Sequence, residues 1–318
     1  KRGNMKIDVV IPVYRPGKRF EELLKRLEKQ TIPVNRIIIM NTEKPYWDSW
    51  ILKAGKLPEN LSVFHLTREE FDHGATRDAA IRKSDADVCV LMTDDALPYN
   101  DRLLENLSRA LFSDERIAAA YAKQLPDRDC GVIERYTRSF NYPDQGRIKT
   151  AEDIPKLGIK TFFCSNVCAA YRRERYLLLG GFTKKTIFNE DMIFAAGAIK
   201  NGYAIAYAAD AEVIHSHNYS GLQQFHRNFD LAVSQADHPE VFAGIRPEGE
   251  GIRLVKSTAS YLIKNKKAFL LPRLIYMSGC KYLGYRMGKR YKKLPRRMIL
   301  WCTMNKSYWT EKVSSAIM

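Results

Sequence analysis

From residue 5 onward, short apolar runs alternate with segments whose apolar residues recur every three or four positions. The first pattern predicts buried strands and the second predicts amphipathic helices. The predicted strands cover residues 7–13, 36–40, 61–66, 87–92, 117–122 and 161–171. The predicted helices cover residues 18–29, 73–83, 101–112 and 191–200. Strands that alternate with helices imply right-handed crossovers, so we expect an α/β fold with a mainly parallel central sheet flanked by helices.

Two stretches depart from this alternation. Residues 124–160 are rich in Pro, Asp, Gly and Arg and show no clear period. A loop of this length inside a compact domain is usually functional or disordered. After two short predicted strands at 203–207 and 212–215, the pattern becomes helical from residue 220 onward.

The apolar run 88–92 leads into two adjacent acids, Asp94 and Asp95. Such a run is typical of a strand buried on both faces, and open α/β sheets bind ligands beyond the carboxyl ends of their strands. Carboxylates there can hold a hard divalent cation, which usually binds phosphates. Two solvated loop acids, or a helix cap, would give the same pattern, so this stretch alone leaves both interpretations open.

Polar segments also follow the first two predicted strands, at residues 14–17 and 41–43. Because parallel strands end along one edge, these segments can share a cleft with Asp94 and Asp95. The chain has no G-x-G-x-x-G and no G-x-x-x-x-G-K-[ST] sequence, which argues against dinucleotide binding and a P-loop. A nucleotide held at the strand ends, with a metal-bound diphosphate, fits better.

A second acidic pair, Glu190 and Asp191, opens the predicted helix at 191–200. Acids in a first helical turn are favoured by capping and by the helix dipole, and they can equally act as a general base. His215 and His217 alternate along an extended segment, so both point to one face. Either could be a metal ligand or a structural histidine.

Charge is concentrated at the C-terminal end of the 318-residue chain. The whole sequence has 52 Lys and Arg against 36 Asp and Glu, a net charge of +16. Residues 251–318 hold 16 of these bases and one acid, Glu311, so their net charge is +15. This asymmetry indicates a catalytic body, residues 5–250, followed by a basic extension that meets an anionic partner.

The remaining composition describes an ordinary globular chain. It is 45% hydrophobic, enough for a substantial core, and its six cysteines are scattered, as expected of reduced thiols in a cytoplasmic protein. We expect no signal peptide and no membrane-spanning helix, since no run of 18 apolar residues occurs. Residues 1–4 precede Met5 and look like an added segment.

Taken together, the motifs of residues 5 to about 225 resemble an inverting family 2 glycosyltransferase with the GT-A fold. They are most similar to bacterial rhamnosyltransferases that build cell-wall or O-antigen polysaccharide. Each motif is weak alone, but their order is specific. The matching segments are Ile11-Pro12-Val13-Tyr14, Asn41-Thr42-Glu43, His73-Gly74-Ala75-Thr76-Arg77-Asp78, Thr93-Asp94-Asp95-Ala96-Leu97-Pro98, Ser165-Asn166 with Arg172-Arg173, Gly180-Gly181-Phe182, Asn189-Glu190-Asp191 and His215-Ser216-His217-Asn218-Tyr219-Ser220.

The resemblance implies a nucleotide-sugar donor, most simply dTDP-rhamnose. The residues that would contact it are Pro12, Tyr14, Arg15, Asn41, Thr42, Glu43, Arg77, Asp78 and Asp94. Of these, Arg77 would meet a phosphate. Ser165 and Asn166 would lie on the acceptor side, and the 124–160 loop would shape the acceptor site.

The resemblance also implies a divalent cation, Mg²⁺ or Mn²⁺. Asp95 matches the last acid of the family's D-x-D motif, whereas Thr93 replaces the first acid. Chelation by two carboxylates is therefore not expected, and His215 or His217 would complete the site together with the diphosphate and water.

Asp191 matches the family's catalytic base, with Glu190 beside it. Asp191 would take the proton of an acceptor hydroxyl as that oxygen attacks the anomeric carbon. A single displacement of this kind inverts the anomeric centre without an enzyme nucleophile.

Residues 251–318 carry nine aromatic residues among their bases, at partly helical spacing. A basic aromatic helix suits an anionic bilayer surface. This fits an acceptor that is a lipid-linked glycan and a location on the inner face of the bacterial plasma membrane. Two interpretations compete with this one: a packed helical subdomain and a nucleic-acid-binding segment. The sequence shows no recognisable nucleic-acid-binding module, and we expect no nucleic acid as a partner.

Three alternative functions are consistent with the sequence. A related transferase could use a UDP-sugar. A metal-dependent nucleotidyltransferase would also need a strand-end acid, but residues 14–18 are a poor version of its glycine-rich loop. A non-enzymatic protein could use the basic extension to bind anionic surfaces.

Overall fold

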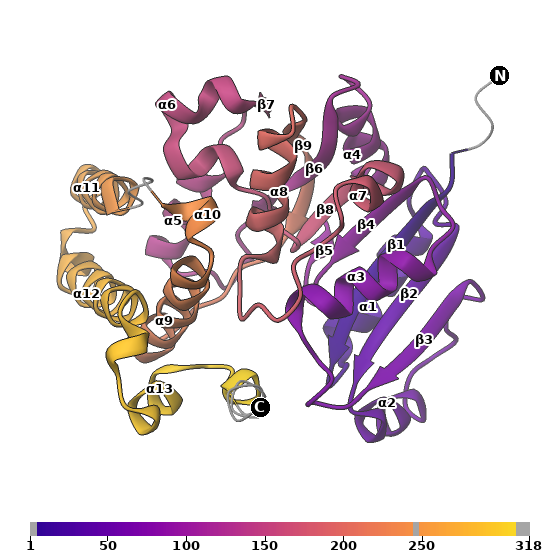
Figure 1. Ribbon diagram of the computed structural model, residues 1–318, viewed down its shortest axis with the longest axis horizontal. Coiled ribbons are helices and arrows are strands. Elements are labelled where there is room, and N and C mark those ends of the chain that lie inside the picture. Colours follow the sequence, from indigo (N-terminus) through magenta and orange to yellow (C-terminus); the bar gives the residue numbers. More distant parts are fainter. Residues whose placement is uncertain (1–4, 244–247, 310–318) are drawn as a thin grey trace. The chain divides into compact units, whose positions relative to one another are not determined.

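The computed structural model describes residues 5–243 and 248–309 (Figure 1). It divides into two compact units. The first comprises Lys1–Asp127, Tyr142–Lys184 and Glu190–His215, and the second Arg128–Asn141, Lys185–Asn189 and Ser216–Met318. The predicted boundary between residues 250 and 251 falls inside the second unit, and that boundary stays a prediction. Residues 1–4, which the sequence analysis interpreted as an added segment, and Glu311 lie outside the described residues.

The first unit is built on a sheet of nine strands in the part of the chain that is described. The strands follow the order β3-β2-β1-β4-β8-β6-β9-β5, and β7 pairs with β9. Their bounds are β1 (Ile7–Tyr14), β2 (Arg36–Thr42), β3 (Leu61–Leu66), β4 (Val88–Met92), β5 (Leu97–Pro98), β6 (Ile117–Leu125), β7 (Arg147–Lys149), β8 (Cys168–Arg172) and β9 (Ala204–Ile214).

Strand directions divide this sheet. β3, β2, β1 and β4 are mutually parallel, and β6 is parallel to β9. β8 runs antiparallel to both of its neighbours, β4 and β6, so the sheet is mixed overall. The predicted α/β fold with a central sheet and flanking helices is confirmed.

Helices cover both faces of the sheet (Figure 1). Alternate residues of β1 (Ile7, Val9, Ile11 and Val13) share one core with leucines of α1 and α4. The residues between them face the other side, where α3 contacts β1 and β2. The helices of this unit are α1 (Lys18–Glu28), α2 (Lys44–Ile51), α3 (His73–Lys83), α4 (Leu103–Leu111), η1 (Ala151–Asp153), α6 (Ile154–Leu157), η2 (Gly158–Phe162), α7 (Arg173–Leu178) and α8 (Glu190–Lys200).

The sequence predictions fail mainly where tertiary contacts override local pattern. The predicted strand at 161–171 is wrong before Cys168: η2 ends at Phe162, a loop follows, and β8 begins at Cys168. The two strands predicted near 203–215 are one long strand, β9. The 124–160 segment is not structureless, since it contains α5 (Val132–Asn141), and the helix α2 was not predicted at all.

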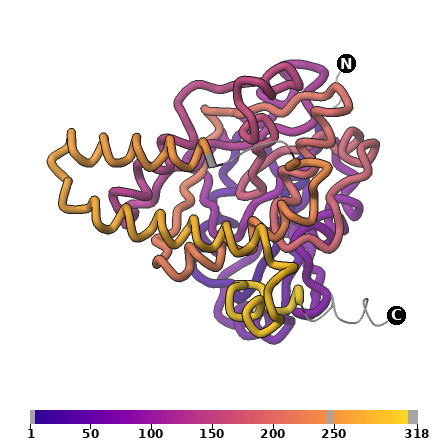
Figure 2. The backbone as a smooth tube through the Cα atoms, turned by 60° about the vertical axis from the view of Figure 1, so that its left-hand side comes forward, coloured from indigo at the N-terminus to yellow at the C-terminus, as the bar shows by residue number. Residues whose placement is uncertain are grey.

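The second unit is helical, as predicted from residue 220 onward. Its helices are α5, α9 (Gly221–Asp237), α10 (Pro239–Phe242), α11 (Glu248–Lys264), η3 (Ala268–Leu270), α12 (Leu271–Gly288), η4 (Tyr291–Lys293) and α13 (Arg296–Cys302). α11 and α12 form an antiparallel pair connected through η3 (Figure 2). In the described residues, no helix is both long enough and apolar enough to span a bilayer.

Glycines let α12 approach α9 closely within this unit. A Cβ atom at Gly284 would overlap the carbonyl of Phe225, and one at Gly288 would overlap the carbonyl of Phe229. Phe225 and Phe229 also belong to the apolar core of this unit. One face of α12 is therefore firmly packed against α9.

The Gly180-Gly181 turn after α7 supplies a matched pair of stability predictions. Both residues have positive φ, +87° and +78°, which costs an L-residue about 1–2 kcal/mol. A Cβ at Gly181 would also overlap the Asp78 carboxylate and crowd Tyr176, whereas Gly180 faces open space. We expect Gly180→Ala to lower the free energy of unfolding by about 1 kcal/mol and Gly181→Ala by about 3 kcal/mol or more, measured by urea denaturation. Equal losses would contradict the close packing at Gly181.

Candidate active site

The ends of β1 and β2 carry an aromatic and guanidinium cluster. Tyr14 meets Tyr46 of α2 edge to face, with ring centroids 5.5 Å apart. The Arg15 guanidinium donates to the Tyr46 hydroxyl at 2.7 Å and lies 4.6 Å from its ring centroid. This hydrogen bond lowers the pKa of the Tyr46 hydroxyl. Arg15 has φ +56°, a turn conformation that re-aims the chain at the strand end. The aromatic rings of this cluster can stack against a nucleotide base, and its guanidinium group can bind a phosphate.

Asn41 lies beside this cluster and is fully buried. Its amide nitrogen is 3.0 Å from Nδ1 of His65, and its carbonyl oxygen has no hydrogen-bond partner within the described chain. Glu43 accepts a hydrogen bond from the backbone N–H of Arg68 at 2.7 Å. Thr42 pairs with Tyr14 in the β1–β2 register, where Pro12 pairs with Met40. The predicted donor residues at the ends of β1 and β2 therefore lie together.

Asp95 and His215 meet at the end of β4. The Nε2 atom of His215 lies 3.5 Å from Oδ1 of Asp95, and His215 is only 7% exposed. The side-chain hydroxyl of Thr93 is buried and has no hydrogen-bond partner among the described residues. His217 follows two residues later, within about 7 Å of chain from His215. It belongs to the second unit and stays a predicted ligand.

Asp94 lies beside Asp95 just after β4. Burial, and then the negative charge of Asp95, raise the pKa of Asp94 to about 6. Donor binding by Asp94 and cation binding by Asp95 stay predictions.

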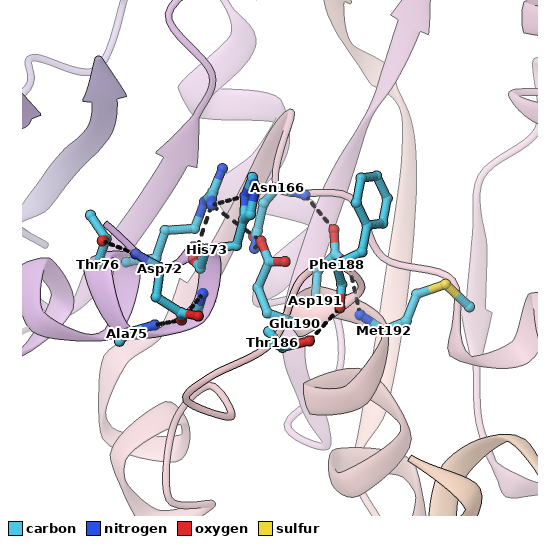
Figure 3. A network of polar contacts seen from close by, with 12 residues as sticks. Asp72, His73, Ala75, Thr76, Asn166, Thr186, Phe188, Glu190, Asp191 and Met192 are labelled. Atoms are coloured by element: carbon cyan, nitrogen blue, oxygen red, sulfur yellow. Dashed lines mark hydrogen bonds and ion pairs between the residues drawn. The ribbon is translucent and has the colours of Figure 1, made fainter. Parts of the chain in front are cut away.

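The predicted base, Asp191, is held at the first turn of α8 (Figure 3). Its Oδ2 accepts a hydrogen bond from the backbone N–H of Asn166 at 2.9 Å. The side chain of Asn166 donates to Glu190 at 3.0 Å and accepts from the Tyr171 hydroxyl at 2.8 Å. Arg77 of α3 completes the group, with its NH1 3.3 Å from Oε1 of Glu190. Asn166 thus holds both carboxylates of the acidic pair in fixed positions.

The two acids of this pair ionise differently. Burial alone would raise the pKa of Glu190, but Arg77, His73 and Asn166 hold it below its usual value. Burial raises the pKa of Asp191 to about 7, and the neighbouring charge of Glu190 adds to that shift. One acid is therefore a permanent anion paired with Arg77. The other gains and loses a proton near neutral pH, which is the property a general base needs.

Other predicted site residues are engaged within the protein. Both oxygens of Asp78 accept hydrogen bonds, from Tyr176 at 2.9 Å and Arg82 at 2.8 Å. Arg77 is 6% exposed and faces Glu190. Donor contacts by Arg77 and Asp78 stay predictions. Ser165 accepts a hydrogen bond from Gln124, and Ser165 and Asn166 as acceptor-binding residues also stay a prediction.

Part of the His-Ser-His-Asn-Tyr-Ser motif has a structural role in the second unit. Asn218 accepts a hydrogen bond from the backbone of Gly131 at 3.0 Å and donates to the carbonyl of Asp129 at 2.8 Å. Ser220 caps α9 by a reciprocal pair of hydrogen bonds with Gln223. The motif therefore combines candidate ligands with residues that fix the chain after them.

Three residues of the site were missed from the sequence: Tyr46, His65 and Gln124. Tyr46 lies in the unpredicted helix α2, and His65 lies in β3 without a motif around it. Gln124 was assigned to a loop but ends β6. No motif marks these positions, and only the strand pairing brings them to the site.

Solved structures with the same fold are glycosyltransferases. The mannosyltransferase PcManGT of Pyrobaculum calidifontis, solved with GDP-Man and Mn²⁺, has a TM-score of 0.56 at 16% identity, over 97% of this chain and 86% of that one. Residues 1–349 of S. aureus TarS give a TM-score of 0.51 at 16% identity, over 91% of each chain. At such identities the likeness shows the fold alone, and this is the GT-A fold.

Sequence comparison then gives the family. The model of glycosyl transferase family 2 matches residues 8–177. The chain is 40% identical to the O-antigen chain rhamnosyltransferase RfbN of Salmonella typhimurium over 309 residues, 96% of each chain. It is 39% identical to WbaN of Salmonella anatum, of the same description, over 306 residues and 95% of each chain. The chain belongs to glycosyltransferase family 2 and is an enzyme. The nucleotidyltransferase and non-enzymatic alternatives are set aside.

The charge difference between Glu190 and Asp191 predicts the pH dependence of sugar transfer. A base works only when deprotonated, so a pKa of about 7 means that kcat/KM falls about tenfold for each pH unit below 7. Glu190→Gln keeps an acceptor for Asn166 but removes the negative charge that helps to raise the pKa of Asp191. We therefore expect the acid limb of its pH profile to move to lower pH.

Asp191→Asn supplies the control for that measurement, because it has no titrating base and should lose the acid limb together with about 10²–10⁴-fold in kcat. Thermal melting of all three proteins checks that they are folded. An acid limb that stays in place in Glu190→Gln would contradict the electrostatic coupling.

Proposed function

We propose that this enzyme transfers L-rhamnose from dTDP-rhamnose to a lipid-linked glycan acceptor in bacterial surface polysaccharide synthesis, with inversion at the anomeric carbon. The observation that carries this proposal is the 40% identity to an O-antigen chain rhamnosyltransferase over 96% of both chains. The similarity extends over almost the full length of both proteins and is not confined to one segment. A UDP-sugar donor is the alternative that the experiment below separates.

Asp191 is the proposed general base. Its carboxylate is oriented by the Asn166 backbone N–H at Oδ2 and by its neighbour, the Met192 N–H, at Oδ1. It takes the proton from the acceptor hydroxyl while that oxygen forms the new bond to the anomeric carbon. The bond from that carbon to the nucleoside diphosphate breaks in the same step, so the product has the opposite anomeric configuration. Glu190, paired with Arg77, holds the base in place and keeps its proton affinity high.

The donor nucleotide is proposed to lie at the ends of β1 and β2. Asn41 has a buried carbonyl oxygen without a hydrogen-bond partner in the described structure, and such a group costs about 1–3 kcal/mol unless a ligand satisfies it. Tyr14, with Tyr46 beside it, presents an aromatic face, and Arg15 presents a cation. Pro12, Thr42, Glu43 and Asp94 complete the proposed donor site from the same strand ends.

The residues at the end of β4 fit a divalent cation. Asp95 supplies a carboxylate oxygen and His215 an imidazole nitrogen 3.5 Å from it, while the Thr93 hydroxyl is buried without a partner among the described residues. Oxygen ligands suit Mn²⁺ or Mg²⁺, and an imidazole among them favours Mn²⁺, the softer of the two cations. A cation bound there would neutralise charge on the departing diphosphate. His217 is the proposed further ligand.

The C-terminal helices are proposed to bind the anionic surface of the membrane that carries the acceptor. α12 has two apolar faces, of which one packs on α9 and the other exposes Ile275, Tyr282 and Leu283. An apolar face left open on a surface helix indicates a binding partner. The exposed bases Arg273 and Lys289 lie near the two ends of this helix. Each Lys or Arg near an anionic bilayer adds about 1 kcal/mol to the free energy of membrane binding. Repulsion between like charges disfavours pairing of this region with a second, equally basic copy.

Donor class is tested by binding and transfer with a panel of nucleotide sugars and Mn²⁺. We expect dTDP-rhamnose, and no UDP-sugar, to raise the melting temperature of the wild type and to support transfer. Asp191→Asn should show the same shift with dTDP-rhamnose but lose transfer, because it removes only the base. A thermal shift with a UDP-sugar alone would establish the alternative donor, and transfer retained by Asp191→Asn would overturn the assignment of the base.

Membrane binding is tested by co-sedimentation with liposomes. We expect the wild type to pellet with phosphatidylglycerol-containing vesicles but not with neutral ones, and the double variant Ile275→Glu, Leu283→Glu to lose at least about tenfold in binding. Leu178→Glu is the matched control, since Leu178 is as exposed (72%) but lies in the first unit. Binding that is equal for neutral vesicles, or unchanged in the double variant, would contradict this surface. Competition by DNA would favour the nucleic-acid alternative.

A further inference from the structure

Gln124 is a buried polar residue at the end of β6 to which neither the fold nor the proposed mechanism has given a role. Its side chain is 3% exposed. β6 and β9 are parallel neighbours, with Gln124 paired to Val213 and Leu125 to Ile214. The backbone N–H of His215 continues this register by donating to the carbonyl of Leu125 at 3.0 Å. Strand pairing therefore places the Gln124 amide beside the imidazole of His215.

Each end of the Gln124 amide has a specific partner. Its nitrogen donates to the Ser165 hydroxyl at 3.0 Å, and its carbonyl oxygen lies 3.0 Å from Nδ1 of His215. A carbonyl oxygen only accepts, so Nδ1 carries the proton in this contact. In a neutral imidazole the other nitrogen, Nε2, then has the lone pair. Nε2 is the atom that lies 3.5 Å from Asp95.

We propose that Gln124 is a positioning residue for the cation site: it fixes the Nδ1–H tautomer of His215, so that the Nε2 lone pair faces the cation beside Asp95. In this arrangement the Ser165 hydroxyl accepts from the amide nitrogen, and the carbonyl oxygen of the same amide faces His215. This inference rests on the proposed cation site and adds the residue that sets the tautomer of its histidine ligand.

The reverse arrangement has a different chemical consequence. If the amide were turned round, its NH₂ group would face Nδ1, and the imidazole proton would move to Nε2. His215 would then donate to Asp95 and could not ligate a cation through Nε2. Partners that orient a metal-binding histidine in this way commonly affect metal affinity by about 10–100-fold.

The first experiment measures Mn²⁺ binding by electron paramagnetic resonance in the presence of dTDP, without turnover. We expect Gln124→Leu, which removes the acceptor, to weaken Mn²⁺ binding about 10–100-fold. Gln124→Glu should restore most of that affinity, because a carboxylate also accepts from Nδ1–H. Gln30→Leu is the matched control: Gln30 is similarly buried (7%) and bonds to Asn100 and Leu104 instead, so its loss should leave Mn²⁺ binding unchanged.

The outcomes separate this inference from the cation site itself. If Asp95→Asn and His215→Asn weaken Mn²⁺ binding but Gln124→Leu does not, the role of Gln124 is overturned and the site stands. If none of the three variants weakens Mn²⁺ binding, both the proposed cation site and the role of Gln124 are overturned. An equal loss in Gln30→Leu, or no restoration in Gln124→Glu, would show a general effect of stability and would also overturn the role of Gln124.

A second measurement does not depend on any variant of Gln124 folding. Long-range ¹H–¹⁵N NMR of ¹⁵N-histidine-labelled wild type at pH 8 distinguishes the two tautomers, and His215→Asn identifies the His215 signals by their loss. We expect the Nδ1–H tautomer. The Nε2–H tautomer would overturn the proposal.

Discussion

The burial of two adjacent carboxylates, Glu190 and Asp191, is the constraint on which the candidate site depends. Two buried like charges repel, and removing either from water carries a large cost. The structure separates their ionisation by pairing Glu190 with Arg77, while the carboxylate of Asp191 accepts hydrogen bonds from the backbone N–H groups of Asn166 and Met192. An acid pair that could have capped a helix thereby becomes one fixed anion and one carboxyl group with a pKa of about 7, as the proposed base requires.

The dipeptide Ser165-Asn166 links the two halves of the chemistry. Asn166 holds both acids of α8, while Ser165 accepts from Gln124, which in turn contacts His215. Within this unit, the hydrogen bonds of two covalently linked neighbours therefore connect the proposed base with the proposed cation ligand His215. Displacement of the loop before β8 would therefore disturb the proposed base, Asp191, and the proposed cation ligand, His215, together.

Local pattern was sufficient for much of the fold. The strands β1 to β4 and the helices α1, α3 and α4 were predicted within a few residues, because continuous apolar runs and helical periodicity are local signals. The strand-end position of Asp95 followed from the same signals. The direction of β8, the continuity of β9 and the helices α2 and α5 were not predicted, since each depends on contacts with distant segments.

The sequence by itself determined the α/β alternation, the order of motifs that gives the family, the acids at the ends of β4 and at the start of α8, and the basic C-terminal region. Only the tertiary structure decided how those acids differ. Arg77 and Glu190 are 113 positions apart in the chain, and Gln124 and His215 are 91 apart, so no local pattern relates them. Proton affinity and histidine tautomer are set by burial and by the partner within about 3 Å, and both arise only when the sheet brings distant strands together.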